Sequence, residues 1–177
     1  MSGFYDLCLR RQSCRNFSNR PVERDKLVKC VDAARLAPSA CNSQPWSFIV
    51  VQTPDKVAET AKCAQQMGIN AFASKAGAFI IIMEEHARLM PAIRSMLDSQ
   101  YFAKGDLGAA TEHVCLAAAD QDLGTCILGL FDRDRLRELF NIPVDKRFAA
   151  LIAVGYPADD VVREKSRKAL DDIVRFE

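Results

Sequence analysis

Residues 37–51 read APSACNSQPWSFIVV, and this stretch decides how the rest of the chain is interpreted. Asn42, Ser43 and Gln44 lie between two prolines, and the run from Trp46 to Val51 is apolar and rich in residues that favour strands. A connecting loop needs only to turn, whereas this one carries a cluster of hydrogen-bonding groups. Because the prolines limit how far the loop can move, we interpret it as a binding surface for a planar ligand with a polar edge.

Apolar residues on both sides of this loop recur at helical spacing or in short strand-like runs. The expected helices are a short one after Ser2, then 22–37, 54–67 with Gly68 as terminator, 105–123, and 132–141 with Asp132 as N-cap. The expected strands are 46–51, 77–83 and 147–154, with 125–129 as a brief strand or an extended turn. Residues 77–83, GAFIIIM, lack polar alternation and predict a central strand covered on both faces. From residue 161 the chain is expected to form an extended arm.

Length, charge and cysteine content exclude several classes of protein. A chain of 177 residues with 49% hydrophobic residues fits a single domain, 1–177, and its net charge of +1 gives no support for general binding to nucleic acid or a membrane surface. The longest apolar run is too short to span a bilayer. Seven cysteines without a C-x-x-C pair predict reduced thiols in a cytoplasmic protein. The two histidines lack metal-ligand spacing, so no metal site is expected.

Two basic clusters lie at opposite ends of the chain. RRQSCR occupies residues 10–15 and REKSRK occupies residues 163–168. Guanidinium and ammonium groups with a serine between them suit a phosphate, but each cluster alone also fits a solvated helix end or a charged tail. Phosphate binding therefore requires that folding bring the two ends together.

Motifs for other chemistry are missing from the sequence. There is no G-x-x-x-x-G-K-[ST] loop, no G-x-G-x-x-G turn and no G-x-S-x-G nucleophile elbow. A bound nucleotide would have to be held by side chains and loop amides, and the reactive chemistry is expected to come from a cofactor.

The segments RRQSCRNF, PSACNSQPWSFIVV, DLGTCILGLFD, FNIP, AVGYP and KSRK, in this order, resemble the nitroreductase family of FMN-dependent flavoproteins. The resemblance implies an α+β fold, with a central, mostly antiparallel sheet flanked by helices and an extended C-terminal arm. It also implies an obligate homodimer with two FMN sites at the subunit interface. Such proteins pass a hydride from NADH or NADPH to flavin N5 and then to a nitroaromatic, quinone or similar small-molecule acceptor in a ping-pong cycle.

The resemblance also implies residues that bind the FMN phosphate and the adjoining part of the cofactor. Arg11 would face the phosphate, and Arg15 would reach the pyrimidine or ribityl side. A positive charge from Arg15 would stabilise the negative charge that reduction leaves at the pyrimidine edge. The matching positions are Arg11, Gln12, Ser13 and Arg15 near the start and Lys165 and Arg167 near the end.

A second set of positions matches contacts to the flavin ring. Pro38, Ser39 and Ala40 correspond to a loop contributed by the partner subunit, and Asn42 to a residue that bonds the polar edge, since its amide both donates and accepts. Leu128 and Gly129 correspond to a segment whose backbone approaches flavin N5 and O4. Some relatives carry an acidic residue at the position of Leu128, so only a main-chain role is expected there.

Alternatives to the reductase remain open at this point. The chain could be a flavin-binding storage or regulatory protein without turnover, or a diverged member that performs reductive dehalogenation or flavin fragmentation. Residues 85–104, which would shape the substrate mouth, carry little pattern. Trp46 is expected to fill core space rather than contact a ligand.

Overall fold

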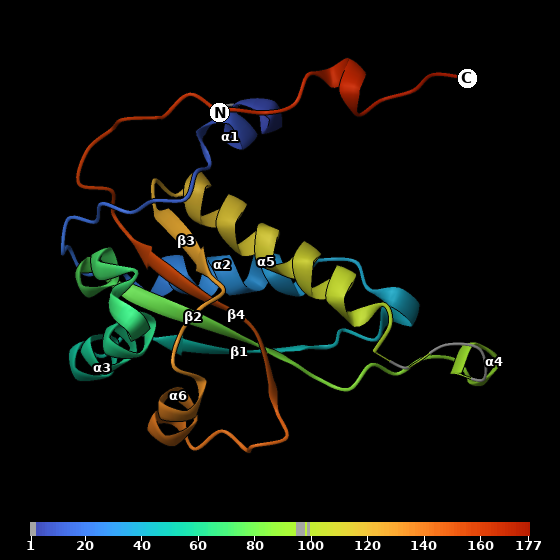
Figure 1. Ribbon diagram of the computed structural model, residues 1–177, viewed down its shortest axis with the longest axis horizontal. Coiled ribbons are helices and arrows are strands. Elements are labelled where there is room, and N and C mark those ends of the chain that lie inside the picture. The colour runs from blue at the N-terminus through green and yellow to red at the C-terminus, as the bar shows by residue number, and fades with distance from the viewer. Residues whose placement is uncertain (1–2, 95–97, 99) are drawn as a thin grey trace.

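A four-stranded antiparallel sheet forms the centre of the described part of the chain, residues 3–94, 98 and 100–177 of a computed structural model (Figure 1). Its strands are β1 (Trp46–Val51), β2 (Ala78–Glu84), β3 (Gly124–Leu128) and β4 (Arg147–Gly155), in the order β1-β2-β4-β3. β2 pairs with both β1 and β4, and its residues 78–82 are completely buried. The predicted central strand is confirmed, and residues 124–128 form a strand rather than a turn.

Helices cover both faces of this sheet (Figure 1). The helices of the described residues are α1 (Phe4–Arg10), α2 (Arg24–Arg35), α3 (Pro54–Ala64), α4 (Pro91–Arg94), α5 (Ala103–Asp120) and α6 (Arg133–Phe140). α2 and α5 pack on one face, whereas α3 and α6 pack on the other. The α+β architecture expected from the sequence is therefore present.

Side-chain alternation along β2 explains why helices cover both faces. Ile80 and Ile82 belong to the core under α2 and α5, and Phe79 and Ile81 belong to the core under α3 and α6. Successive strand residues point to opposite faces, so an unbroken apolar run needs an apolar partner on each side. Trp46, which is 9% exposed, lies in the first core as expected.

Helix ends follow the sequence signals at one position and depart from them at another. The Asp132 carboxylate accepts a hydrogen bond from the Arg135 N–H and caps α6, as predicted. α3 ends at Ala64, before the expected terminator Gly68, which has φ 74° and closes a separate 3₁₀ turn, Gln66–Gly68. At the start of the chain Gly3 is the N-cap of α1, and Ser2, the expected cap, lies outside the described residues.

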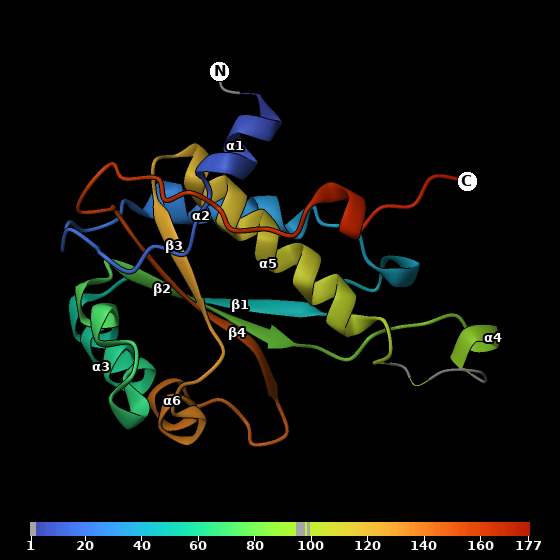
Figure 2. The same cartoon turned by 45° about the horizontal axis from the view of Figure 1, so that its top comes forward.

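Two segments lie outside the layered body. α4 projects beyond the sheet in both views (Figures 1 and 2), and residues 95–97 and 99 of the same segment lie outside the described part. From residue 158 to the end, the C-terminal segment contains no regular structure apart from a 3₁₀ turn, Leu170–Asp172. Among the described helices, none combines the length and the apolar character needed to cross a bilayer.

Candidate functional site

The residues after α1 lie along the edge strand β3. Ser13 forms a parallel bridge with Thr125, and the Cys14 N–H donates to the Thr125 carbonyl at 2.8 Å. Gly124 allows this approach, because a Cβ added there would lie 2.6 Å from the Cys14 Cβ. Residues 11–14 therefore have a fixed position at one edge of the sheet.

The C-terminal segment runs antiparallel to these N-terminal residues (Figure 2). The Ala158 N–H donates to the Asn16 carbonyl at 2.9 Å, and the Asn16 amide donates to Asp159 Oδ2 at 2.8 Å. Farther along, the Lys165 ammonium donates to the Arg11 carbonyl. The two basic ends of the sequence are therefore in direct contact.

Positive charge gathers where the two ends meet. The pKa of Lys165 is lowered, first by loss of solvent and then by the charges of Arg11, Arg167 and Arg163. Glu112 of α5 opposes them: its Oε1 lies 3.1 Å from Arg11 Nε, which makes no hydrogen bond in the described structure. Guanidinium and ammonium groups gathered in this way form a set of donors that suits a phosphate dianion.

Arg15 lies beside this cluster and next to β3. It is exposed, and its charge acts to lower the pKa of the Cys126 thiol, although burial raises that pKa overall. Ser13 hydrogen bonds with the same thiol. Arg15 is therefore the member of the N-terminal basic cluster that lies next to β3 and remains open to solvent.

The loop between α2 and β1 has an unusual backbone. Cys41, Asn42 and Gln44 all have positive φ, at 53°, 51° and 47°. Left-handed backbone is costly for side chains other than glycine, with asparagine the most tolerant, so other contacts must hold this shape. The Ser39 hydroxyl accepts from the Gln44 N–H at 2.9 Å.

A carboxylate of α5 holds the same loop from outside. The Ala40 N–H donates to both oxygens of Asp106, at 3.3 and 3.2 Å. This contact places residues 40–42 beside the N-terminal end of α5 (Figure 1). The loop stiffness predicted from the prolines therefore also depends on an anchor that the loop sequence does not show.

The predicted site residues fall into three groups in one chain. Arg11, Gln12, Ser13, Arg15, Lys165 and Arg167 come together where the chain ends meet. Pro38, Ser39, Ala40 and Asn42 lie in the loop at the N-terminal end of α5. Leu128 and Gly129 lie at the end of β3. The Leu128 side chain is 3% exposed, and a Cβ added to Gly129 would meet no atom within 4 Å, so the backbone is open to approach there.

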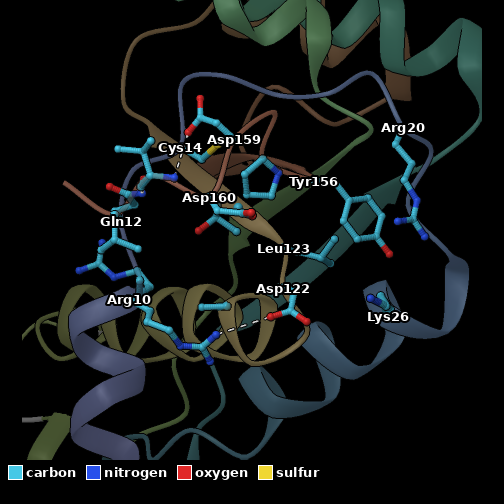
Figure 3. A pocket seen from close by; sticks show the side chains of 17 residues that line it. Arg10, Gln12, Cys14, Arg20, Lys26, Asp122, Leu123, Tyr156, Asp159 and Asp160 are labelled. Carbon is cyan, nitrogen blue, oxygen red and sulfur yellow. Dashed lines mark hydrogen bonds and ion pairs between the residues drawn. The ribbon is translucent and has the colours of Figure 1, made fainter. Parts of the chain in front are cut away.

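A cavity of about 540 Å³ lies under the start of the C-terminal segment (Figure 3). Arg11, which pairs with Glu112, and Gln12 line it, and other basic groups of its lining also have partners nearby. Arg10 pairs with Asp122 at 3.5 Å, and the Arg20 guanidinium lies 3.9 Å from the centre of the Tyr156 ring. The cavity therefore adjoins the basic cluster, but the charges of Arg10 and Arg20 in its lining already have partners within the chain.

Two site residues were missing from the sequence prediction. Glu112 and Asp106 are isolated acids on a helix rich in alanine, so no motif marks them. Arg163 belongs to the predicted C-terminal basic cluster but not to the positions that the family resemblance implies. The described residues contain no group of three or more His, Cys, Asp or Glu side chains able to hold a metal ion.

Comparison with known proteins identifies related chains. The family model "Nitroreductase family" matches residues 9–156. A protein of Archaeoglobus fulgidus named "Putative NADH dehydrogenase/NAD(P)H nitroreductase" is 31% identical over 154 residues, which are 85% of this chain and 83% of the relative. Iodotyrosine deiodinase 1 of Rattus norvegicus is 26% identical over 198 residues, covering 97% of this chain and 68% of the relative.

A solved structure gives the same fold. A protein from Exiguobacterium sibiricum, crystallised in complex with FMN, matches with a TM-score of 0.84 and 21% identity, covering 100% of this chain and 98% of the other. At that identity the likeness concerns the fold.

Proposed function

The chain belongs to the nitroreductase family, and on that premise we propose that it is an FMN-dependent oxidoreductase that uses NADH or NADPH to reduce nitroaromatic, quinone or similar acceptors. The observation that carries the proposal is the meeting of the two basic chain ends, where the Lys165 ammonium donates to the Arg11 carbonyl. Loss of solvent there lowers the pKa of Lys165, and the charges of Arg11 and Arg167 lower it further. Glu112 is the carboxylate that pairs with Arg11 there, and several cations lie around it, so a doubly charged phosphate would relieve their repulsion.

The residues where the two chain ends meet fit FMN in charge and in donor chemistry. Arg11, Lys165 and Arg167 would hold the phosphate, and Ser13 would add a neutral donor. Arg15, exposed beside them, would place a positive charge near the pyrimidine or ribityl side. When bound, FMN would accept a hydride from the nicotinamide and deliver it to the acceptor.

In the proposed site a second copy of the chain would supply contacts to the flavin ring. The loop with Pro38, Ser39, Ala40 and Asn42 is attached to the N-terminal end of α5, away from the basic cluster. We therefore infer a homodimer in which each loop completes the partner's site. The strongly exposed apolar side chains of α1 and the C-terminal segment support this, since a chain association would cover them. They include Phe4, Tyr5, Leu170, Ile173 and Phe176, which are 63–89% exposed.

In this dimer the C-terminal segment would act as the expected extended arm and lie against the partner. The loop backbone would present Asn42 to the flavin edge already ordered, so that little entropy is lost on binding. The main chain at Leu128 and Gly129 would approach the ring from β3, where an added Cβ at residue 129 meets only open space. Seven free cysteines fit a reducing, cytoplasmic location.

Spectroscopy of the purified protein tests the proposal. Reconstitution with FMN should give flavin absorbance that NADH or NADPH bleaches without oxygen, and a nitroaromatic or quinone should restore it. A protein that binds FMN but never bleaches with either nucleotide would instead be a storage or regulatory protein. A colourless protein that cannot be reconstituted would overturn the proposal.

Reductive dehalogenation is the second candidate, favoured by the likeness to iodotyrosine deiodinase 1. The acceptor panel should therefore include a halogenated phenol, with halide release measured directly. Faster reoxidation by the halogenated phenol than by nitroaromatics and quinones would make dehalogenation the main activity.

A further inference from the structure

Gln12 forms the densest link between the two chain ends. Its Nε2 donates to the Val161 carbonyl at 2.7 Å. Its Oε1 accepts from the Arg163 backbone N–H at 3.2 Å and from the Arg163 Nε at 3.1 Å. The carboxamide thus satisfies one carbonyl and one amide of the C-terminal segment, as a neighbouring strand would.

Contacts to the N-terminal residues recur at every second residue of the C-terminal segment. Val161 and Arg163 bond to Gln12, Arg163 Nη2 also donates to the Ser13 carbonyl at 2.5 Å, and Lys165 donates to the Arg11 carbonyl. A period of two is that of one face of an extended chain. Arg167 is the next residue in this series, whereas Glu164 belongs to the opposite set.

Slippage by one residue in one direction would exchange Lys165 and Arg167 for Glu164 and Ser166, placing a carboxylate where a phosphate is to bind. Slippage in the other direction would present Ser166 and Lys168 and so lose one of the two cations. The Asn16–Asp159 hydrogen bond fixes the chain upstream. Between Asp159 and Lys165, the described bonds that hold the backbone of the C-terminal segment to the N-terminal residues are those of Val161 and Arg163 with Gln12.

We propose that Gln12 is a positioning residue that sets the register of the C-terminal segment and so presents Lys165 and Arg167 to the cofactor phosphate. The inference rests on the proposed FMN binding, and it gives Gln12 a function beyond the cofactor contact expected from the sequence. Its side chain acts through the segment, so its effect on the segment exists whether or not FMN is bound.

Amide hydrogen exchange in the flavin-free protein tests the register itself. The Arg163 amide bonds to a side chain, so Gln12→Leu should speed its exchange by about fivefold, the equivalent of one lost hydrogen bond. The Cys14 amide donates to the Thr125 carbonyl of β3 and not to a Gln12 side-chain atom, so it should exchange as before. Unchanged exchange at Arg163 would overturn the proposal, even if FMN binding changed.

FMN titration supplies the second readout. Gln12→Leu should weaken FMN binding by about fivefold, whereas Glu164→Gln, on the opposite set, is the matched control and should bind as the unmodified protein does. Combining Gln12→Leu with Arg163→Leu should cost less than the sum of the two single changes, because both remove the same link. Additive effects, or equal weakening by Glu164→Gln, would contradict the proposal. If the unmodified protein bound no FMN, the proposed function would fail while the exchange test would still decide the role of Gln12.

Discussion

Glu112 Oε1 lies 3.1 Å from Arg11 Nε, which puts a single carboxylate of α5 into an otherwise positive cluster. The Glu112 side chain is 42% exposed, so the ion pair itself stabilises the protein by at most about 1 kcal/mol. The same carboxylate would repel a bound phosphate and so lower the affinity for FMN.

Replacing Glu112 by glutamine should therefore tighten FMN binding by about two- to fivefold, because the isostere removes the repulsion and keeps an acceptor near Arg11. The flavin-free variant should unfold at a lower temperature, because the cations lose their counter-charge. Fluorescence titration measures the affinity, and the gain should shrink at high salt. Weaker binding would instead mean that Glu112 mainly orients Arg11.

Asp106 should support cofactor affinity without touching the cofactor. Asp106→Ala removes the acceptor for the Ala40 N–H and frees a loop with three left-handed residues. Both hydrogen bonds are long, so we expect FMN binding to weaken by about fivefold, the equivalent of one modest hydrogen bond. Lys104→Ala, an exposed change in the same helical turn, is the control. Equal affinities for the two variants would remove Asp106 from the site.

Arg15→Ala tests the electrostatic effect on the flavin. We expect a lower flavin reduction potential or weaker FMN binding, since the negative charge at the pyrimidine edge loses its nearest predicted cation. Dye-equilibrated reduction gives the potential, and Arg24→Ala on the exposed start of α2 serves as the control. Unchanged potential together with unchanged affinity would show that Arg15 has no part in the site.

The lowered pKa of Lys165 predicts how FMN affinity depends on pH. The phosphate binds best to charged Lys165, so affinity should fall as pH rises through the lowered pKa of the flavin-free protein. The fall should therefore begin below the usual range for lysine. Lys165→Arg should remove this dependence, because arginine stays charged throughout. An identical alkaline profile in both proteins would assign the effect to another group.

Exposed apolar side chains of the C-terminal segment should hold the proposed dimer together. Ile173 and Phe176 are 63% and 89% exposed, and changing both to aspartate should shift the protein toward monomer in light scattering. Val144→Asp is the control, since that side chain is 88% exposed in the turn before β4. A monomeric parent protein would contradict the dimer outright.

The sheet was predictable from the sequence because its strands are short apolar runs that can be recognised from neighbouring residues alone. The unbroken run in β2 needs apolar cover on both faces, and the structure provides it with α2 and α5 on one side and α3 and α6 on the other. The end of α3 was predicted wrongly. Gly68 has the expected left-handed backbone but belongs to a separate turn, so this glycine is not what ends α3 at Ala64.

The candidate site was predictable only where its residues lie in motifs. The two basic clusters were visible, but their meeting depends on contacts between residues about 150 positions apart, such as Gln12 with Arg163. Asp106 and Glu112 resemble any other helix acids until the fold places them against the loop and Arg11. The FMN contacts themselves remain predictions from family resemblance.

Asp106 and Glu112 are six residues apart on one helix, a separation of about 9 Å along its axis. In the proposed pair of chains, Glu112 would steady a cation of its own chain's cofactor site while Asp106 would steady the loop that closes the neighbour's. Each α5 helix would then contact residues of both cofactor sites, through Glu112 at one site and Asp106 at the other. Binding of FMN to the first site should consequently change the FMN affinity of the second. The fraction of dimers that carry one FMN should therefore differ from the fraction expected for two independent sites.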